Sequence, residues 1–164
     1  MLSYRAAIGL GSNLGDRSRN IDAALALLDG QPLISVLLRS ELIETEPVRV
    51  SDRDPGGPYI NAAAIVQTGL SPRELLGTLQ RVERALGRDR TRQAHGAARV
   101  IDLDLLLYSD QTVSERGLTV PHPQLHRRSF VLGPLAQIAP GWPIPGLGVT
   151  VRAAQERCVT HDRA

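Results

Sequence analysis

The sequence predicts an α+β fold of the ferredoxin-like kind, with a βαββαβ core in which helices pack on a mostly antiparallel sheet. Segments with the periodicity of strands and of helices follow one another in the order strand, helix, strand, strand, helix, strand, which is the order of that fold. The chain has 164 residues, 42% of them hydrophobic, which is enough for a substantial core. Because no linker or change of composition divides it, we expect residues 1–164 to form a single domain.

The first half of the chain supplies a strand, a helix and two further strands. Residues 4–10 are apolar and end in a turn rich in glycine and asparagine, and residues 16–29 repeat apolar side chains at helical spacing before Gly30. Residues 33–45 predict one long strand, because they are rich in valine, isoleucine and leucine. Residues 59–68 predict another strand, with alternate side chains on opposite faces.

Tyr59 and Asn61 share one face of the strand predicted at residues 59–68. A tyrosine beside an amide can stack on a flat heterocycle and hydrogen-bond to its edge. A packed tyrosine and an asparagine in a local turn explain the pattern at least as well. These two residues therefore indicate a binding site only in combination with other motifs.

The second half of the chain begins with the best-defined helix. Ser71-Pro72-Arg73-Glu74 is a capping box with proline at the first helical position, and the helix that follows ends at Gly87. We expect a strand at residues 99–107, a hairpin turn at Ser109 and Asp110, two short helices at 124–138, irregular chain at 141–147 and a last helix at 149–159.

Two aspartates interrupt the strand predicted at residues 99–107, which is otherwise apolar after Arg99. Asp102 and Asp104 are two positions apart, so their side chains point to one face of the strand, about 7 Å from each other. Adjacent carboxylates in a buried strand repel unless a cation neutralises them, and oxygen ligands suit Mg²⁺. A solvated strand end is an equally good explanation of this motif alone.

Arginines gather in the sequence before this strand. From Gly87 onward the segment lacks hydrophobic periodicity and predicts a long loop, of the kind that is often functional. Arginines beside a pair of carboxylates supply what polyphosphate chemistry needs, because guanidinium groups bind phosphate oxygens while the carboxylates hold Mg²⁺. A solvated basic surface is the alternative, and we prefer it for Arg81 and Arg84, which lie within the predicted helix.

His122 lies between two prolines, where the chain is expected to be extended. A rigid imidazole in this position could bind phosphate, although a single histidine is more often structural. All 19 basic residues are arginine, so a lysine-dependent phosphate loop is excluded. Cys158 is the only cysteine and cannot form an internal disulfide. Because the first residues do not look like a signal peptide and no segment is long enough to span a bilayer, we expect a cytoplasmic protein.

The order and spacing of several motifs resemble those of 6-hydroxymethyl-7,8-dihydropterin pyrophosphokinases. This family transfers a pyrophosphoryl group from ATP, its co-substrate, to a pterin alcohol in folate biosynthesis and releases AMP. The matching motifs are Gly11-Ser12-Asn13-Leu14-Gly15-Asp16-Arg17, Glu44-Thr45-Glu46-Pro47-Val48, Tyr59-Ile60-Asn61-Ala62, Arg88 with Arg90, Arg99-Val100-Ile101-Asp102-Leu103-Asp104, and Val120-Pro121-His122-Pro123 followed by Arg128 and Phe130.

The resemblance implies roles for the matching residues. Asp102 and Asp104 would bind two Mg²⁺ ions that bridge the triphosphate and orient the pterin hydroxyl, and Arg88 and Arg99 would complete the catalytic set. The residues implied to bind ATP are Arg88, Arg90, Arg99, His122 and Arg128, with a weaker indication for Gln80 and Glu83. The residues implied to bind the pterin are Tyr59 and Phe130 on its two sides and Asn61, Thr45 and Val48 at its edge.

The chain departs from the family pattern before the diacid strand. Ala94-His95-Gly96-Ala97-Ala98-Arg99 stands where the family usually has Arg-Trp-Gly-Pro-Arg. Losing a tryptophan and a proline favours the open form of a loop, so we expect residues 88–98 to be open or poorly ordered without substrates.

Two other classes of protein fit part of the sequence. A ferredoxin-like nucleic-acid-binding module without catalysis would need exposed aromatic side chains on its central strands, and only 3% of this chain is aromatic. A metal-dependent sugar-nucleotide transferase would use an Asp-x-Asp pair, but the chain is short and shows no Rossmann half. We therefore expect small-molecule substrates, no nucleic-acid or membrane partner, and a monomer.

Overall fold

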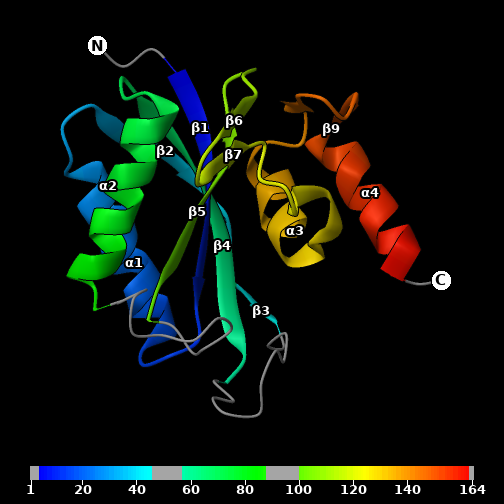
Figure 1. Cartoon of the computed structure of the whole chain (residues 1–164). Helices are drawn as coiled ribbons and strands as arrows, with labels where there is room; N and C mark the ends of the chain where they lie inside the picture. The colour runs from blue at the N-terminus through cyan, green and yellow to red at the C-terminus, as the bar shows by residue number, and fades with distance from the viewer. Residues whose placement is uncertain (1–3, 46–56, 88–99, 163–164) are drawn as a thin grey trace.

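The computed structural model describes residues 4–45, 57–87 and 100–162 (Figure 1). Its main sheet has the strand order β2, β4, β1, β5, and every pairing is antiparallel. A short strand, β3, also pairs with β4. These strands are β1 (Tyr4–Ser12), β2 (Ile34–Arg39), β3 (Ile43–Thr45), β4 (Tyr59–Thr68) and β5 (Asp102–Tyr108). The predicted ferredoxin-like arrangement is confirmed, with β1 at the centre between β4 and β5.

Helices cover both faces of this sheet. Helices α1 (Arg17–Asp29) and α2 (Pro72–Ala85) lie on one side in Figure 1, and α3 (Ser129–Ile138) and α4 (Val151–Asp162) lie on the other. Ile8 and Leu103 pack in the core under α1 and α2, whereas Ala7 and Leu106 pack in the core under α3 and α4. We call these two sides of the sheet the α1/α2 face and the α3 face.

The predicted helix boundaries are confirmed by their caps. Asp16 precedes α1, and its carboxylate accepts a hydrogen bond of 3.2 Å from the Arg19 backbone N–H. Ser71 precedes α2 and accepts from the Glu74 backbone N–H at 3.2 Å, as a capping box requires. Gly87 follows α2 with a φ of +98°, a conformation that glycine adopts without steric cost.

The prediction of one long strand at residues 33–45 is wrong, because the chain forms β2 and β3 with a break at residues 40–42. Ser40 explains the break. Its backbone N–H donates to the Ala63 carbonyl at 2.8 Å, and its hydroxyl takes the place of a backbone acceptor for the Ala63 N–H at 2.8 Å. A side chain that pairs with the neighbouring strand in this way interrupts the regular ladder.

The end of β5 also differs from expectation. Ser109 and Asp110 form the predicted turn, but β5 does not pair with the next strand; instead β6 (Val113–Glu115) pairs with β7 (Leu118–Val120). β5 itself begins at Asp102 rather than at residue 99. Residues 141–147 were expected to be irregular, yet part of this segment forms β8 (Pro143–Ile144), which pairs with β9 (Val149–Thr150).

The remaining predicted elements agree with the structure. The two short helices expected at residues 124–138 are a 3₁₀ turn, Leu125–Arg127, and α3. The last helix is α4. In the described part of the chain, none of the helices combines the length and the apolar character needed to cross a membrane.

Candidate active site

The two aspartates of β5 lie on the α3 face of the sheet. Asp102 and Asp104 are half-buried, while Leu103 and Leu105 between and after them are buried in the core under α1 and α2. Alternation along the strand therefore sends both carboxylates to the side opposite this core. The shared face that the sequence predicted is confirmed, and the two aspartates are the first and third residues of an edge strand of the main sheet.

The neighbouring strand β1 leaves a strip of backbone without large side chains beside these aspartates. Gly11 lies opposite Asp102, and Gly9 lies opposite Asp104. On the other side of β1, Gly11 lies opposite Asn61 of β4. A Cβ atom on Gly11 would be 3.1 Å from Asn61 Oδ1, tighter than an ordinary contact. Glycine is therefore needed here for the close approach of the Asn61 and Tyr59 side chains, which cover the buried Gly11.

Asn61 and its neighbours form the second group of polar and aromatic side chains on this face. Asn61 is 8% exposed, and its Nδ2 donates to Thr45 Oγ1 at 2.6 Å. Thr45 lies opposite Tyr59 in the pairing of β3 with β4, so both flank the same end of the sheet. Because β1 separates β4 from β5, this group and the diacid pair are about 10 Å apart in the plane of the sheet.

His122 is tied to the far side of β5. Its backbone N–H donates to the Leu106 carbonyl at 2.9 Å, and its Nδ1 accepts a 3.1 Å hydrogen bond from the Gln124 backbone N–H. Burial lowers the pKa of His122, Arg128 lowers it further, and Asp102 opposes both effects. The neutral imidazole therefore carries its proton on Nε2, the atom that can donate to a phosphate oxygen.

Arg128 and Phe130 lie at the start of α3. The guanidinium carbon of Arg128 is 5.8 Å from the centroid of the Phe130 ring, a cation–π contact. Arg128 and Asp102 both act on the pKa of His122. The charges of Arg128 and Asp102 therefore lie near enough to His122 to act on its imidazole, and the resemblance assigns these three residues to the nucleotide and the metal.

For some predicted site residues, the structure does not show a position on the α3 face. Val48, Arg88, Arg90 and Arg99 lie outside the described residues, as does the segment 88–98 that we expected to be open. Gln80 is half-buried on α2, the helix that covers the α1/α2 face, so its contact with ATP stays a prediction.

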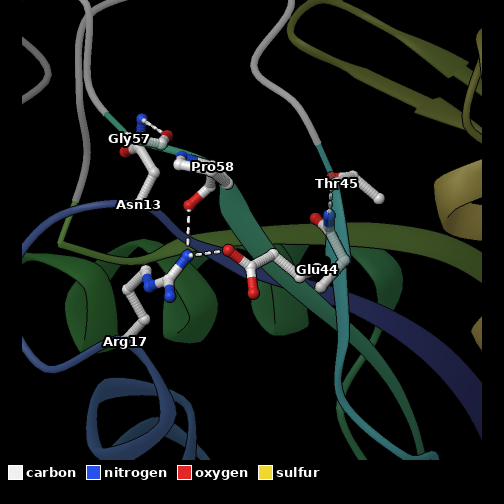
Figure 2. Close-up of polar contacts among 7 residues, drawn as sticks. Asn13, Arg17, Glu44, Thr45, Gly57 and Pro58 are labelled. Atoms are coloured by element: carbon white, nitrogen blue, oxygen red, sulfur yellow. Dashed lines mark hydrogen bonds and ion pairs between the residues drawn. The ribbon is translucent and has the colours of Figure 1, made fainter.

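Two further side chains support the site: Glu83, for which the resemblance gave only a weak indication of contact with ATP, and Arg17, which had no role assigned from the sequence. Glu83 of α2 is 1% exposed, and its carboxylate accepts a 3.1 Å hydrogen bond from the Leu103 backbone N–H, between the two aspartates. Arg17 joins the start of α1 to β3 and β4, as Figure 2 shows. The motif around Arg17 matched the family, but a match to a motif does not indicate which atoms a side chain contacts.

The donor set suits Mg²⁺ bound together with a nucleotide. Asp102 and Asp104 offer carboxylate oxygens from one strand face, and in the described parts of the chain no group of three or more acidic, histidine or cysteine side chains is placed to hold a metal. Magnesium commonly binds to one or two protein carboxylates and takes its other ligands from phosphate and water. Two aspartates without further protein ligands therefore fit a metal ion that binds as a complex with a polyphosphate.

Two proteins of similar sequence have the same enzyme name. A 2-amino-4-hydroxy-6-hydroxymethyldihydropteridine pyrophosphokinase of Bacillus subtilis is 41% identical over 133 residues, which are 81% of this chain and 77% of that protein. The enzyme of the same name from Methylorubrum extorquens is 42% identical over 150 residues, which are 92% of this chain and 90% of that protein.

Solved structures show the same fold. An HPPK-DHPS protein in complex with substrates has a TM-score of 0.77 at 13% identity, over 98% of this chain and 44% of that one. Wild-type Plasmodium falciparum HPPK-DHPS with pteroate has a TM-score of 0.76 at 15% identity, over 99% of this chain and 44% of that one. This chain thus spans less than half the length of these two proteins.

The match to a family model covers most of the chain. The model for 7,8-dihydro-6-hydroxymethylpterin-pyrophosphokinase (HPPK) matches residues 7–140, which run from within β1 through α3 and therefore include both groups of side chains on the α3 face. The chain belongs to the HPPK family.

Proposed function

We propose that the α3 face of the sheet is where this chain transfers a pyrophosphoryl group from ATP to 6-hydroxymethyl-7,8-dihydropterin. Members of the family are ATP-dependent pyrophosphokinases of folate biosynthesis, and this chain is such an enzyme. The observation that supports this location is the spacing of the two groups of side chains. A strip of β1 backbone separates Asn61 and Tyr59 from Asp102 and Asp104, so a ring and a polyphosphate can bind side by side.

The pterin is assigned to the β4 side of the strip. The Asn61 amide is buried and oriented by Thr45, so it can pair with a donor and an acceptor at the edge of the ring. Tyr59 and Phe130 supply aromatic faces for stacking, with Phe130 coming from α3. Val48 is assigned to the ring edge from the resemblance alone.

The triphosphate is assigned to the β5 side. Asp102 and Asp104 would hold two Mg²⁺ ions, which when bound would neutralise phosphate charge and orient the pterin hydroxyl. His122 donates from Nε2 to a phosphate oxygen, and the Arg128 guanidinium offsets negative charge beside it. Arg88, Arg90 and Arg99 are assigned to the same phosphates on the basis of the family motif.

The reaction needs positioning and charge stabilisation more than covalent help from the protein. The hydroxymethyl oxygen attacks the β-phosphorus of ATP, the bond from that phosphorus to the oxygen bridging to the α-phosphorus breaks, and AMP leaves with the electron pair. The hydroxyl proton is released, and no nucleophile from the protein is consumed. Holding both substrates against β1 converts a bimolecular encounter into a step within one complex.

A direct assay tests this function. The purified protein is mixed with ATP, Mg²⁺ and 6-hydroxymethyl-7,8-dihydropterin, and AMP and the pterin diphosphate are quantified by chromatography. We expect equal amounts of both products and none when Mg²⁺ is chelated. Formation of ADP, or AMP without a pterin product, would contradict the assignment. Tight binding of single-stranded RNA without turnover would instead favour the nucleic-acid-binding alternative.

We also propose that residues 1–164 work as one domain, as a monomer in the cytoplasm, on small molecules alone. We place every residue of the site in a single copy of the chain. Size-exclusion chromatography with light scattering, run with and without an unreactive ATP analogue, measures the oligomeric state, and a dimer at assay concentration would contradict this part of the proposal.

A further inference from the structure

We propose that Arg17 is a positioning residue for the pterin half of the site, an inference that rests on the function proposed above. Arg17 is the first residue of α1, which packs on the α1/α2 face of the sheet, whereas the substrates are placed on the α3 face. Its guanidinium instead connects the start of α1 to the two strands that carry Thr45 and Tyr59. Holding these strands sets the distance between Tyr59, which is assigned to stack on the ring, and Thr45, which orients the Asn61 amide.

The contacts of Arg17 reach the residue before each of these two side chains (Figure 2). Its Nη1 donates to the Pro58 carbonyl at 2.6 Å, and Pro58 directly precedes Tyr59. The same nitrogen lies 3.4 Å from Glu44 Oε1, and Glu44 directly precedes Thr45. Nearby, Asn13 Nδ2 donates to the Gly57 carbonyl at 3.5 Å, so the turn after β1 contacts the same short segment twice.

The two contacts of Arg17 differ in strength. The bond to the Pro58 carbonyl is short and has a charged donor, which makes it the stronger kind of hydrogen bond. The Glu44 side chain is 59% exposed and the ion pair is 3.4 Å long, so water screens it and it contributes little. Positioning therefore depends mainly on the backbone contact, and removing Glu44 should matter less than removing Arg17.

A purely structural role for Arg17 predicts a different outcome. An arginine that only stabilises the fold would lower the melting temperature and leave the balance between the two substrates unchanged. A positioning residue would weaken pterin binding selectively, because Tyr59 and Thr45 serve the ring and Asp102 and Asp104 serve the phosphates.

Arg73 is a matched control elsewhere in the chain. Its Nη2 donates to the Arg116 carbonyl at 2.8 Å and lies 3.0 Å from Glu115 Oε2, so it too joins a helix start to one backbone carbonyl and one carboxylate. These contacts hold α2 to the β6–β7 hairpin, away from the residues assigned to the pterin.

The experiment compares Arg17→Ala, Arg17→Lys, Glu44→Ala and Arg73→Ala in the full chain, using steady-state kinetics with each substrate varied and calorimetric pterin binding in the presence of an unreactive ATP analogue. We expect Arg17→Ala to raise the pterin KM about tenfold while the ATP KM changes less than about twofold, because sub-ångström misplacement of binding groups has effects of this order. Lysine should restore part of the loss. Glu44→Ala and Arg73→Ala should leave the pterin KM within about twofold of wild type.

Several outcomes would overturn the proposal. They are an unchanged pterin KM in Arg17→Ala, equal losses for ATP and pterin, or the same pterin loss in Arg73→Ala. If Arg17→Ala does not fold, the Arg17→Lys variant decides, since a pterin KM equal to that of wild type together with a lower melting temperature would show a structural role only. Failure of the proposed function is recognised separately, because wild type would then form no AMP with the pterin alcohol.

Discussion

Replacing Gly11 by alanine tests the geometry of the strip of β1 backbone most directly. A Cβ on Gly11 would be 3.1 Å from Asn61 Oδ1 and 3.5 Å from Tyr59 Cδ1. The residue does not have a positive φ, so alanine is compatible with the backbone. The added methyl group must therefore displace the Asn61 amide by a few tenths of an ångström or remain in a crowded contact, and in either case it disturbs a side chain assigned to the pterin.

The expected effects on stability and on binding have different sizes. Glycine within a strand costs about 0.5–1 kcal/mol relative to alanine, and the crowding at Asn61 offsets this gain, so the free energy of unfolding should change by less than about 1 kcal/mol. Misaligning one buried amide hydrogen bond to the ring costs about 1–3 kcal/mol. This corresponds to a pterin Kd that rises by about 5- to 150-fold.

Gly9→Ala is the matched control for this prediction. A Cβ on Gly9 would meet the Leu106 side chain at 3.4 Å, an ordinary contact with an adaptable side chain. Pterin and ATP binding by calorimetry, together with urea unfolding, are measured for both variants and wild type. We expect Gly9→Ala to bind the pterin normally. A Gly11→Ala variant that binds the pterin within twofold of wild type would refute the reasoning about close approach.

Three further predictions concern the two halves of the site. Asn61→Ala should weaken pterin binding by about 1–3 kcal/mol with little change for ATP, and equal losses in calorimetry would argue against its assignment. Asp102→Asn and Asp104→Asn should each lower turnover at least about a thousandfold without lowering the melting temperature measured without Mg²⁺, because one of two neighbouring like charges is removed; near-normal turnover would show that they do not hold the metal. Because the pKa of His122 lies below its ordinary value of 6.5, the unfolded chain binds more protons there, so stability falls as the pH decreases below 6.5. Urea unfolding at about pH 7.5 and about pH 5.5 should show a smaller difference in His122→Asn than in wild type.

The fold could be predicted because its signals are local. Ser71 and Pro72 specify where α2 begins, and the alternation along residues 59–68 specifies which face of the sheet each side chain of β4 takes. The break between β2 and β3 could not be predicted in this way. It depends on Ser40 meeting Ala63, and a pairing between residues distant in sequence leaves no periodic signal in either segment.

The site was predictable to the extent that its residues belong to one element. Asp102 and Asp104 share a strand, so their common face follows from the strand period alone. Arg17 and Glu83 act across elements, on Pro58 and on the Leu103 backbone, and neither contact follows from the periodicity of α1 or α2. Their partners are backbone groups, which every residue has, so the sequence does not indicate which backbone group each side chain contacts.

The central strand shows how function constrains the stability of this fold. β1 places Gly9 and Gly11 on the α3 face and Ile8 and Leu10 on the α1/α2 face. Each glycine weakens the strand by about 0.5–1 kcal/mol, and burial of each aliphatic side chain on the other face stabilises it by about 1.5–3 kcal/mol. The strand can therefore carry glycines beneath Asn61 and Tyr59, which are assigned to the pterin, only because its opposite face is packed. It follows that substitutions of Ile8 or Leu10 should impair folding before they impair binding, whereas substitutions of Gly11 should do the reverse.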